Sequence, residues 1–172
     1  MRSVKSVVDL NASSKNRLRE AWDRLHKLPG GKRAFSALVG MAAPYTGSIG
    51  AQVKVLRRGH AEVELRDRRA VRNHLQCVHA IALANLAELT GNVAVAYSLP
   101  DDARFIVAGI SLDYLKKARG TITGVCDCPI VESSAKQEYE VSVSMRNQDG
   151  VEVCRATLRT LVGPKKDAKK GS

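Results

Sequence analysis

The chain has 172 residues, 44% of them hydrophobic, and a formal net charge of +11. This length allows one domain with a sizeable core and argues against two. The sequence contains no apolar run of the roughly 18 residues that a membrane span needs, and its N-terminus lacks the apolar core of a secretory signal, so we expect a cytoplasmic protein.

The first 49 residues predict an N-terminal helical extension that covers one edge of the core. Apolar residues recur at helical spacing from Leu18 to Leu28, with Ser14 or Asn16 as the N-cap and a Pro-Gly-Gly stop. The expected elements are, in order, a helix over 18–28, a helix over 34–41 and a loop over 45–50.

The rest of the chain alternates between strand and helix patterns. Alternating apolar residues predict a β-hairpin over 51–65, and the segment 80–97 is apolar on nearly every side, which is typical of a buried helix. Strands then follow over 105–116, 120–128, 137–145 and 151–161, with a clear hairpin turn over 147–150. This order predicts an α+β fold in which a mostly antiparallel, curved sheet wraps around one central buried helix.

Basic residues account for the net charge and predict a polyanionic partner. Four lysines lie in residues 163–172, which we expect to be a disordered basic tail. Ten others form two groups, Lys54, Arg57, Arg58, Arg66, Arg68, Arg69 and Arg72, and then Lys116, Lys117 and Arg119. Aromatic residues are only 4% of the chain and are not interleaved with these groups, so a phosphorylated small molecule is favoured over nucleic acid.

One stretch, residues 73–80, carries the candidate chemistry. It reads Asn-His-Leu-Gln-Cys-Val-His-Ala and runs directly into the predicted buried helix, whose only carboxylate is Glu88. Burial would raise the pKa of Glu88 and make it a usable general base. The amide of Asn73 can donate to a carbonyl oxygen, and the backbone N–H of Ala80 at the helix start is a ready oxyanion donor. His79 would orient the reacting groups or donate a hydrogen bond.

Purely structural roles are open for the same residues. Glu88 could instead bond Asn85, Thr90 or an arginine at a dimer seam. Asn73 could be a turn or capping residue, and His79 a helix-terminal residue without chemistry.

Other kinds of site have less support. His74 and His79 lie in a loop without a third ligand nearby, so we expect no metal site. No G-x-S-x-G elbow or P-loop is present. The cysteines show no C-x-x-C spacing, and we expect all four, Cys77, Cys126, Cys128 and Cys154, to be reduced and buried.

Helical geometry separates the two halves of the candidate site. At 100° and 1.5 Å per residue, Glu88 is rotated by roughly 180° from His79 and lies about 13 Å further along the helix. One copy of the helix therefore cannot bring both residues to one site. Two chains could, if their sheets pair edge to edge and their central helices run antiparallel, so we expect a homodimer, or a homotetramer built from dimers.

The spacing of these residues resembles that of the hotdog-fold thioesterases, above all the phenylacetate-pathway-type acyl-CoA thioesterases and their relatives. Their pattern pairs an Asn six residues before a His with an acid nine residues after it, as Asn73, His79 and Glu88 do here. The strand motif over 112–120 adds to the resemblance, which covers roughly residues 50–161. It implies a hotdog domain over 50–162 between the extension 1–49 and the tail.

The resemblance also implies an activity, the hydrolysis of an acyl-CoA or similar thioester, with the coenzyme A thioester as substrate and no further cofactor. Glu88 of one subunit would activate water, or attack directly, at a carbonyl polarised by Ala80 N–H and Asn73 of the other. The residues expected near the substrate are Lys116, Lys117 and Arg119 at the coenzyme A phosphates, and Ile81 and Cys77, the latter as a packing residue.

The chain departs from the family pattern where glycines are common. It has Gln76 three residues before His79, and Ala80 and Ile81 after it. Ala80 keeps its N–H, whereas Ile81 narrows the acyl entrance. Two alternatives therefore stay open besides hydrolysis, a non-catalytic acyl-CoA-binding or regulatory module and an acyl-thioester hydratase or dehydratase.

Overall fold

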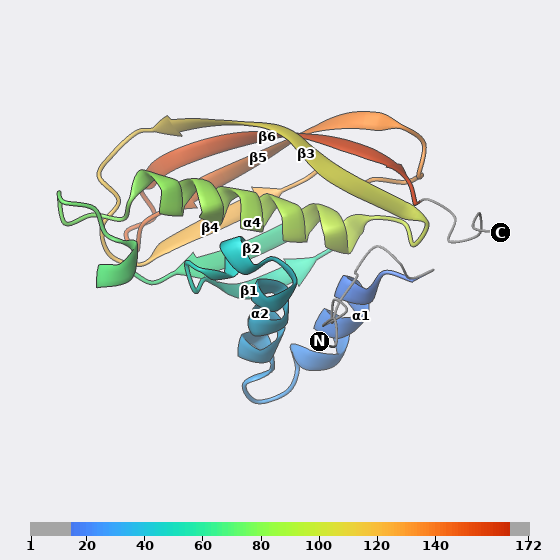
Figure 1. Ribbon diagram of the computed structural model, residues 1–172, viewed down its shortest axis with the longest axis horizontal. Coiled ribbons are helices and arrows are strands. Elements are labelled where there is room, and N and C mark those ends of the chain that lie inside the picture. The colour runs from blue at the N-terminus through green and yellow to red at the C-terminus, as the bar shows by residue number, and fades with distance from the viewer. Residues whose placement is uncertain (1–14, 166–172) are drawn as a thin grey trace, which may run out of the picture.

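A six-stranded antiparallel sheet arches over one long helix, α4, with the N-terminal helices below it (Figure 1). The computed structural model describes residues 15–165. The elements are, in chain order, α1 (Arg17–Leu25), α2 (Gly31–Ala42), α3 (Pro44–Gly47), β1 (Gln52–Arg57), β2 (His60–Leu65), a 3-10 turn (Arg69–Val71), α4 (Ala80–Ser98), β3 (Ala103–Tyr114), β4 (Ile122–Asp127), β5 (Gln137–Arg146) and β6 (Glu152–Pro164).

The strands lie in the order β1-β2-β4-β5-β6-β3, and every neighbouring pair is antiparallel. The two predicted hairpin turns are present, with Gly59 at φ +76° between β1 and β2 and Gly150 at φ +76° between β5 and β6. Both positions need the left-handed conformation that glycine adopts without a steric penalty. The predicted fold class, a curved antiparallel sheet around a central helix with N-terminal helices, is confirmed.

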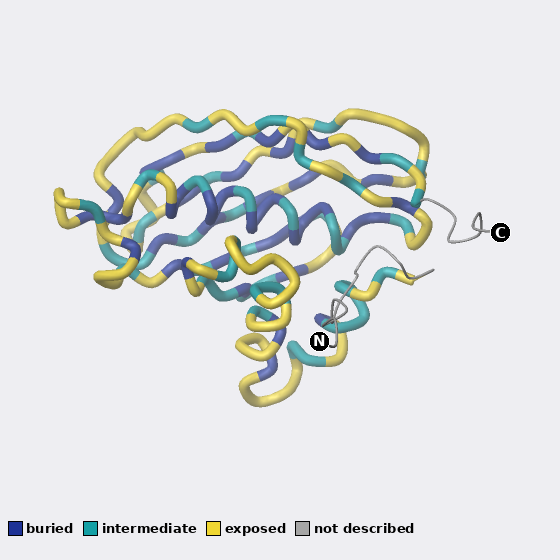
Figure 2. Tube along the Cα trace, viewed as in Figure 1, coloured by how far each residue is buried: buried dark blue, intermediate teal, exposed yellow. Residues whose placement is uncertain are grey.

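Most of α4 is buried against the concave face of the sheet (Figure 2). The helix approaches β4 so closely that a Cβ at Gly124 would lie 2.5 Å from the Thr90 hydroxyl. The expectation that α4 is buried all round is wrong along one stripe, which lies on the side away from the sheet. This open stripe consists of the exposed Ile81 and the half-buried Ala84, Glu88 and Asn92.

The N-terminal helices pack against β1 and against the C-terminal half of α4. Asn16, one of the two residues expected as N-cap, caps α1. Its Oδ1 accepts a hydrogen bond from the backbone N–H of Arg19 at 3.0 Å. Trp22 and Phe35 join α1 to α2 with their ring centroids 5.0 Å apart, and both are buried. Part of the expected loop over 45–50 is instead the short helix α3, which begins at Pro44.

The boundary between the sheet and the expected tail differs slightly from expectation. Strand β6 extends to Pro164, which pairs with Ala103, so the first two residues of the expected tail belong to the sheet. The tail lysines from residue 166 onward, and Ser14 as the other N-cap candidate, lie outside the described residues. Within residues 15–165, α4 is the one helix long and apolar enough to span a membrane, but most of it is buried inside the molecule.

Candidate active site

The candidate site starts from a closed loop between the 3-10 turn and α4. Arg72 and Val78 form a β-bridge across its base, and His79 N–H donates to the carbonyl of Val71 at 2.8 Å. Val78 N–H donates to the carbonyl of Ala118, also at 2.8 Å, which ties the loop to the segment after β3. These backbone bonds fix the loop at the N-terminus of α4.

Asn73 organises this loop from inside. Its Oδ1 accepts hydrogen bonds from the backbone N–H groups of Leu75 at 2.9 Å and Cys77 at 3.3 Å. The carbonyl half of the amide is therefore used by the loop, whereas the Nδ2 group has no acceptor within residues 15–165. Asn73 is thus a turn residue whose amide N–H groups are unused in the described chain.

Gln76 explains why glycine is common at this position in the family that the sequence resembles. Its φ is +55°, and it is the only residue other than glycine with a positive φ in the part of the chain that the structure describes. A side chain in this conformation is strained, whereas glycine is not. The departure from the pattern therefore preserves the loop shape at a cost in conformational energy.

His79 is the N-cap of α4. Its Nδ1 accepts a hydrogen bond from the backbone N–H of Ile81 at 3.0 Å, which requires an unprotonated Nδ1 and leaves the ring proton on Nε2. The imidazole is exposed, so Nε2–H is available to a ligand. The N–H of Ala80, the first residue of α4, has no acceptor within residues 15–165 and belongs to the positive end of the helix dipole.

Tyr114 contributes a contact that was not predicted. Its hydroxyl donates to the carbonyl of Ala80 at 3.2 Å, which joins the end of β3 to the first turn of α4. Partial burial raises the pKa of Tyr114, so the hydroxyl stays protonated as a donor. The strand motif over 112–120 contains this residue, but a sequence pattern does not reveal which backbone atom it contacts.

The expected substrate-binding residues gather around the same loop. Lys116, Lys117 and Arg119 are exposed on both sides of Ala118, whose carbonyl holds Val78. Ile81 is 55% exposed in the first turn of α4. Cys77 is buried, as expected of a packing residue, and the other three cysteines are also buried free thiols.

A second basic group was not predicted as part of the site. Arg69 and Arg72 border a surface depression that also contains Asn73 and Gln76. Asp67 holds Arg72 through a hydrogen bond of 2.6 Å from Nε and also accepts one from the backbone N–H of Gly120 at 3.0 Å. Arg72 is thereby held next to the loop through its Nε atom.

Glu88 does not meet the loop within one chain. It lies on the outward stripe of α4 and is half-buried in the single chain, so the full burial expected of it is not reached there. It forms no hydrogen bond or ion pair with the residues that the structure describes. Asn85 donates instead to the carbonyl of Tyr45 at 3.1 Å, and Thr90 to that of Leu86 at 2.7 Å, so neither of them pairs with Glu88.

The chain is similar to known proteins over most of its length. A family model described as a domain of unknown function, DUF4442, matches residues 31–162. A crystal structure from structural genomics is 35% identical, covers 86% of this chain and 99% of its own, and superposes with a TM-score of 0.75. No curated protein sequence matches the chain.

More distant solved structures share the fold. A Pseudomonas aeruginosa protein of unknown function, described as a probable thioesterase, is 21% identical with a TM-score of 0.70, and the match covers 80% of this chain and 97% of that one. A thioesterase family protein from Silicibacter pomeroyi is 13% identical with a TM-score of 0.64, over 75% of this chain and 96% of that one. At these identities the likeness concerns the arrangement of helix and sheet.

Proposed function

The chain is a hotdog-fold member of the DUF4442 family, and from that premise we propose that it hydrolyses acyl-coenzyme A thioesters as a homodimer. The proposal rests on the hydrogen-bond donors at the N-terminus of α4. There the N–H of Ala80, the amide of Asn73 and Nε2 of His79 provide three donors on one closed loop. Donors fixed in this way stabilise the negative charge that develops on a thioester carbonyl during attack.

Glu88 supplies the base in this proposal, and it does so for the other subunit. The carboxylate is on the open stripe of α4 and makes no ion pair within residues 15–165, so it is free to meet the loop of a second copy. It takes a proton from water as the water attacks the carbonyl, and the thiolate of coenzyme A leaves with a proton. Alternatively the carboxylate attacks directly and water hydrolyses the resulting anhydride.

The edge strand supports the dimer. β3 ends the sheet, and its outer edge has no partner strand within the described chain, whereas β1 at the opposite edge is packed against α2. Side chains on the α4 side of β3 remain open, as Ile110 at 44% and Tyr114 at 51% exposure illustrate. A long, partly apolar edge of this kind is a template for pairing with another chain. Antiparallel pairing of two β3 strands would set the two α4 helices side by side.

The basic groups favour coenzyme A as the leaving group. Lys116, Lys117 and Arg119 flank the loop on one side, and Arg69 and Arg72 flank it on another. Phosphates of the nucleotide end of coenzyme A would meet these cations, and arginine is suited to hold them with two parallel hydrogen bonds. The reaction needs no cofactor other than the substrate's own coenzyme A. Four free thiols fit the reducing cytoplasm, where we place the activity.

A comparison of Glu88→Ala with wild type tests the proposal. Both proteins are assayed against a panel of acyl-coenzyme A thioesters, with release of free coenzyme A as the readout. We expect kcat to fall at least about 100-fold, because the reaction loses its general base or nucleophile. Glu140→Gln, which changes an exposed carboxylate on β5, is the control and should leave kcat unchanged.

Three results would replace the proposal. Equal, near-background rates for wild type and Glu88→Ala would rule out thioester hydrolysis as the activity of this protein. Tight binding of acyl-coenzyme A without turnover would point to a binding or regulatory module. Formation of a 3-hydroxyacyl product from an enoyl-coenzyme A would point to a hydratase.

A further inference from the structure

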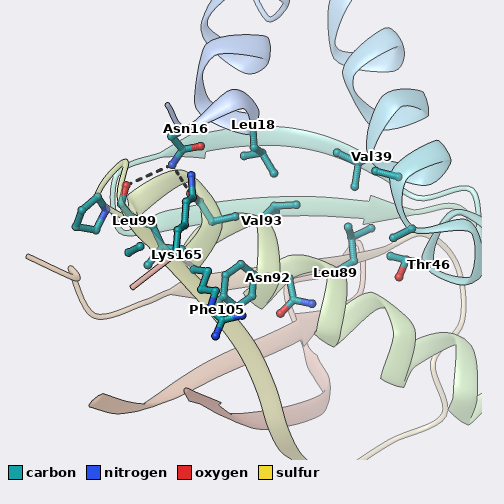
Figure 3. Close-up of a pocket in the computed structure, with 16 residues that line it drawn as sticks. Asn16, Leu18, Val39, Thr46, Leu89, Asn92, Val93, Leu99, Phe105 and Lys165 are labelled. Atoms are coloured by element: carbon teal, nitrogen blue, oxygen red, sulfur yellow. Dashed lines mark hydrogen bonds between the residues drawn. The ribbon is translucent and has the colours of Figure 1, made fainter. Parts of the chain in front are cut away.

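A cavity of about 260 Å³ lies between the N-terminal helices and the C-terminal half of α4 (Figure 3). Most of its wall is aliphatic or aromatic and comes from four elements, α1, α2, α4 and β3. The side chains that define it are Leu18, Val39, Leu89, Val93, Ala96 and Phe105. The lining also contains the polar residues Asn16, Thr46 and Asn92 and the charged residues Arg104 and Lys165, so an apolar occupant would lie along the aliphatic and aromatic part of the wall.

Side-chain hydrogen bonds of Asn16 hold the segment before α1 against α4 at this cavity. Nδ2 of Asn16 donates to the carbonyls of Ala96 at 2.7 Å and Leu99 at 3.3 Å, the two bonds drawn in Figure 3. Outside the cavity lining, Nδ2 of Asn85 donates to the carbonyl of Tyr45 at 3.1 Å and joins α4 to α3. The helices that line the cavity are therefore connected to α4 by side-chain hydrogen bonds.

The cavity is continuous with the stripe of α4 that carries Glu88. Leu89 and Asn92 both border it, and Figure 3 shows the two side chains on neighbouring turns of the helix. Asn92 is four residues after Glu88, so the two side chains share a face and are separated by about one helical turn, roughly 5.4 Å. A molecule whose carbonyl reaches Glu88 can therefore extend past Asn92 into the cavity.

We propose that this cavity binds the acyl chain of the substrate and makes the protein selective for medium-length, unbranched acyl groups. The inference rests on the proposed hydrolysis of thioesters at Glu88. A cavity of 150 Å³ lined by Leu, Ile and Phe holds benzene, with six carbons, so a volume of 260 Å³ has room for about ten carbons. The N-terminal helices, together with α4 and β3, thus limit the length of the acyl chain.

Filling the cavity tests the assignment. Ala42→Phe on α2 and Ala96→Phe on α4 each place a ring at its wall. Ala34→Phe makes the same change at an exposed position of α2 that does not border the cavity, and it is the matched control. Each protein is assayed with acetyl-, butanoyl-, octanoyl- and decanoyl-coenzyme A, and also with glutaryl-coenzyme A, because Arg104 borders the cavity and could select a second carboxylate.

We expect wild type and Ala34→Phe to prefer octanoyl over acetyl groups. Each buried methylene is worth about fourfold in kcat/KM. Both filling variants should lose at least about tenfold on octanoyl-coenzyme A while retaining their rate on acetyl-coenzyme A. An unchanged chain-length profile, an equal loss on all substrates, or a preference for glutaryl-coenzyme A in wild type would overturn the inference.

A binding measurement separates this inference from the proposed hydrolysis. S-octyl- and S-ethyl-coenzyme A are thioethers that cannot be cleaved, and their affinities are measured by calorimetry. Tighter binding of the octyl compound, lost in Ala42→Phe and kept in Ala34→Phe, supports the acyl cavity even if the protein hydrolyses nothing. Equal affinities for the two thioethers in wild type refute the cavity even if hydrolysis occurs.

Discussion

At the scale of single residues, the loop before α4 combines structural and chemical roles in the same side chains. Asn73 uses its carbonyl oxygen to hold Leu75 and Cys77, while its amide nitrogen has no acceptor within residues 15–165. His79 uses Nδ1 to cap α4, which places the ring proton on Nε2. For both residues the structural and the functional interpretations of the sequence are compatible, since one atom of each side chain serves the fold and another is left for a ligand.

Gln76 is the residue at which this loop is strained. Its φ of +55° costs a side chain roughly 1–2 kcal/mol. Glycine adopts the same conformation freely but loses about 0.5–1 kcal/mol of chain entropy on folding. We therefore predict that Gln76→Gly stabilises the protein slightly and raises Tm by about 1–3 °C.

Thermal unfolding followed by circular dichroism measures this change. Leu75→Gly is the control, because its φ is not positive and a glycine there gains nothing. It should lower Tm. A lower Tm for Gln76→Gly as well would mean that contacts of the Gln76 side chain outweigh its backbone strain.

At the scale of elements, the apolar periodicity of the sequence predicted the long helix α4 and missed the short helix α3. The 19 residues of α4 and the turn before β6 follow from apolar pattern and turn chemistry. Helix α3 has only four residues, too few for a period to be visible, and the proline that begins it equally suits a loop. The open stripe of α4 was also missed, because Ile81 and Ala84 are as apolar as the buried residues beside them.

The connections between elements depend on pairs that no sequence spacing reveals. Asp67 joins the arginine-rich connection after β2 to Gly120, which lies before β4, and to Arg72 at the base of the loop. Its side chain is only 10% exposed. The hydrogen bond from Arg72 holds the pKa of Asp67 below its usual value. A depressed carboxylate pKa contributes stability that is present above the unfolded-state pKa and is lost as the pH falls.

Asp67→Asn should therefore destabilise the protein in a pH-dependent way. We predict that the free energy of unfolding falls by about 1 kcal/mol at neutral pH, which corresponds to a Tm lower by about 2–4 °C. The loss is small because Arg72 is partly exposed, and solvent weakens its interaction with Asp67. The difference from wild type should be complete above about pH 4 and should shrink below it, as Asp67 is protonated in the wild type. Denaturation at a series of pH values measures this, with Glu132→Gln at an exposed position as control. A difference that is constant down to pH 2 would contradict the assignment.

At the scale of the whole molecule, the structure separates the candidate site into two halves. The loop with Asn73, His79 and Ala80 lies at the N-terminus of α4, and Glu88 lies on the outward stripe of the same helix. The sequence already predicts this separation from the helical period. It does not predict the identity of the open surface, which depends on how β3 ends the sheet and leaves Ile110 and Tyr114 uncovered.

Mixing two inactive variants tests whether two chains share each site. Asn73→Asp keeps the oxygen that holds the loop but removes the amide donor, and Glu88→Ala removes the base. Each homodimer should be inactive. In a heterodimer, one site combines both defects and the other has neither, so random exchange of subunits should restore about one quarter of the wild-type activity.

The measurement is thioesterase activity after the two variants are unfolded together in denaturant and refolded, with each variant refolded alone as control. Restored activity requires that Glu88 of one subunit acts at the loop of the other, because a site within one chain stays defective in every combination. Dimers confirmed by light scattering but without restored activity would refute the shared site.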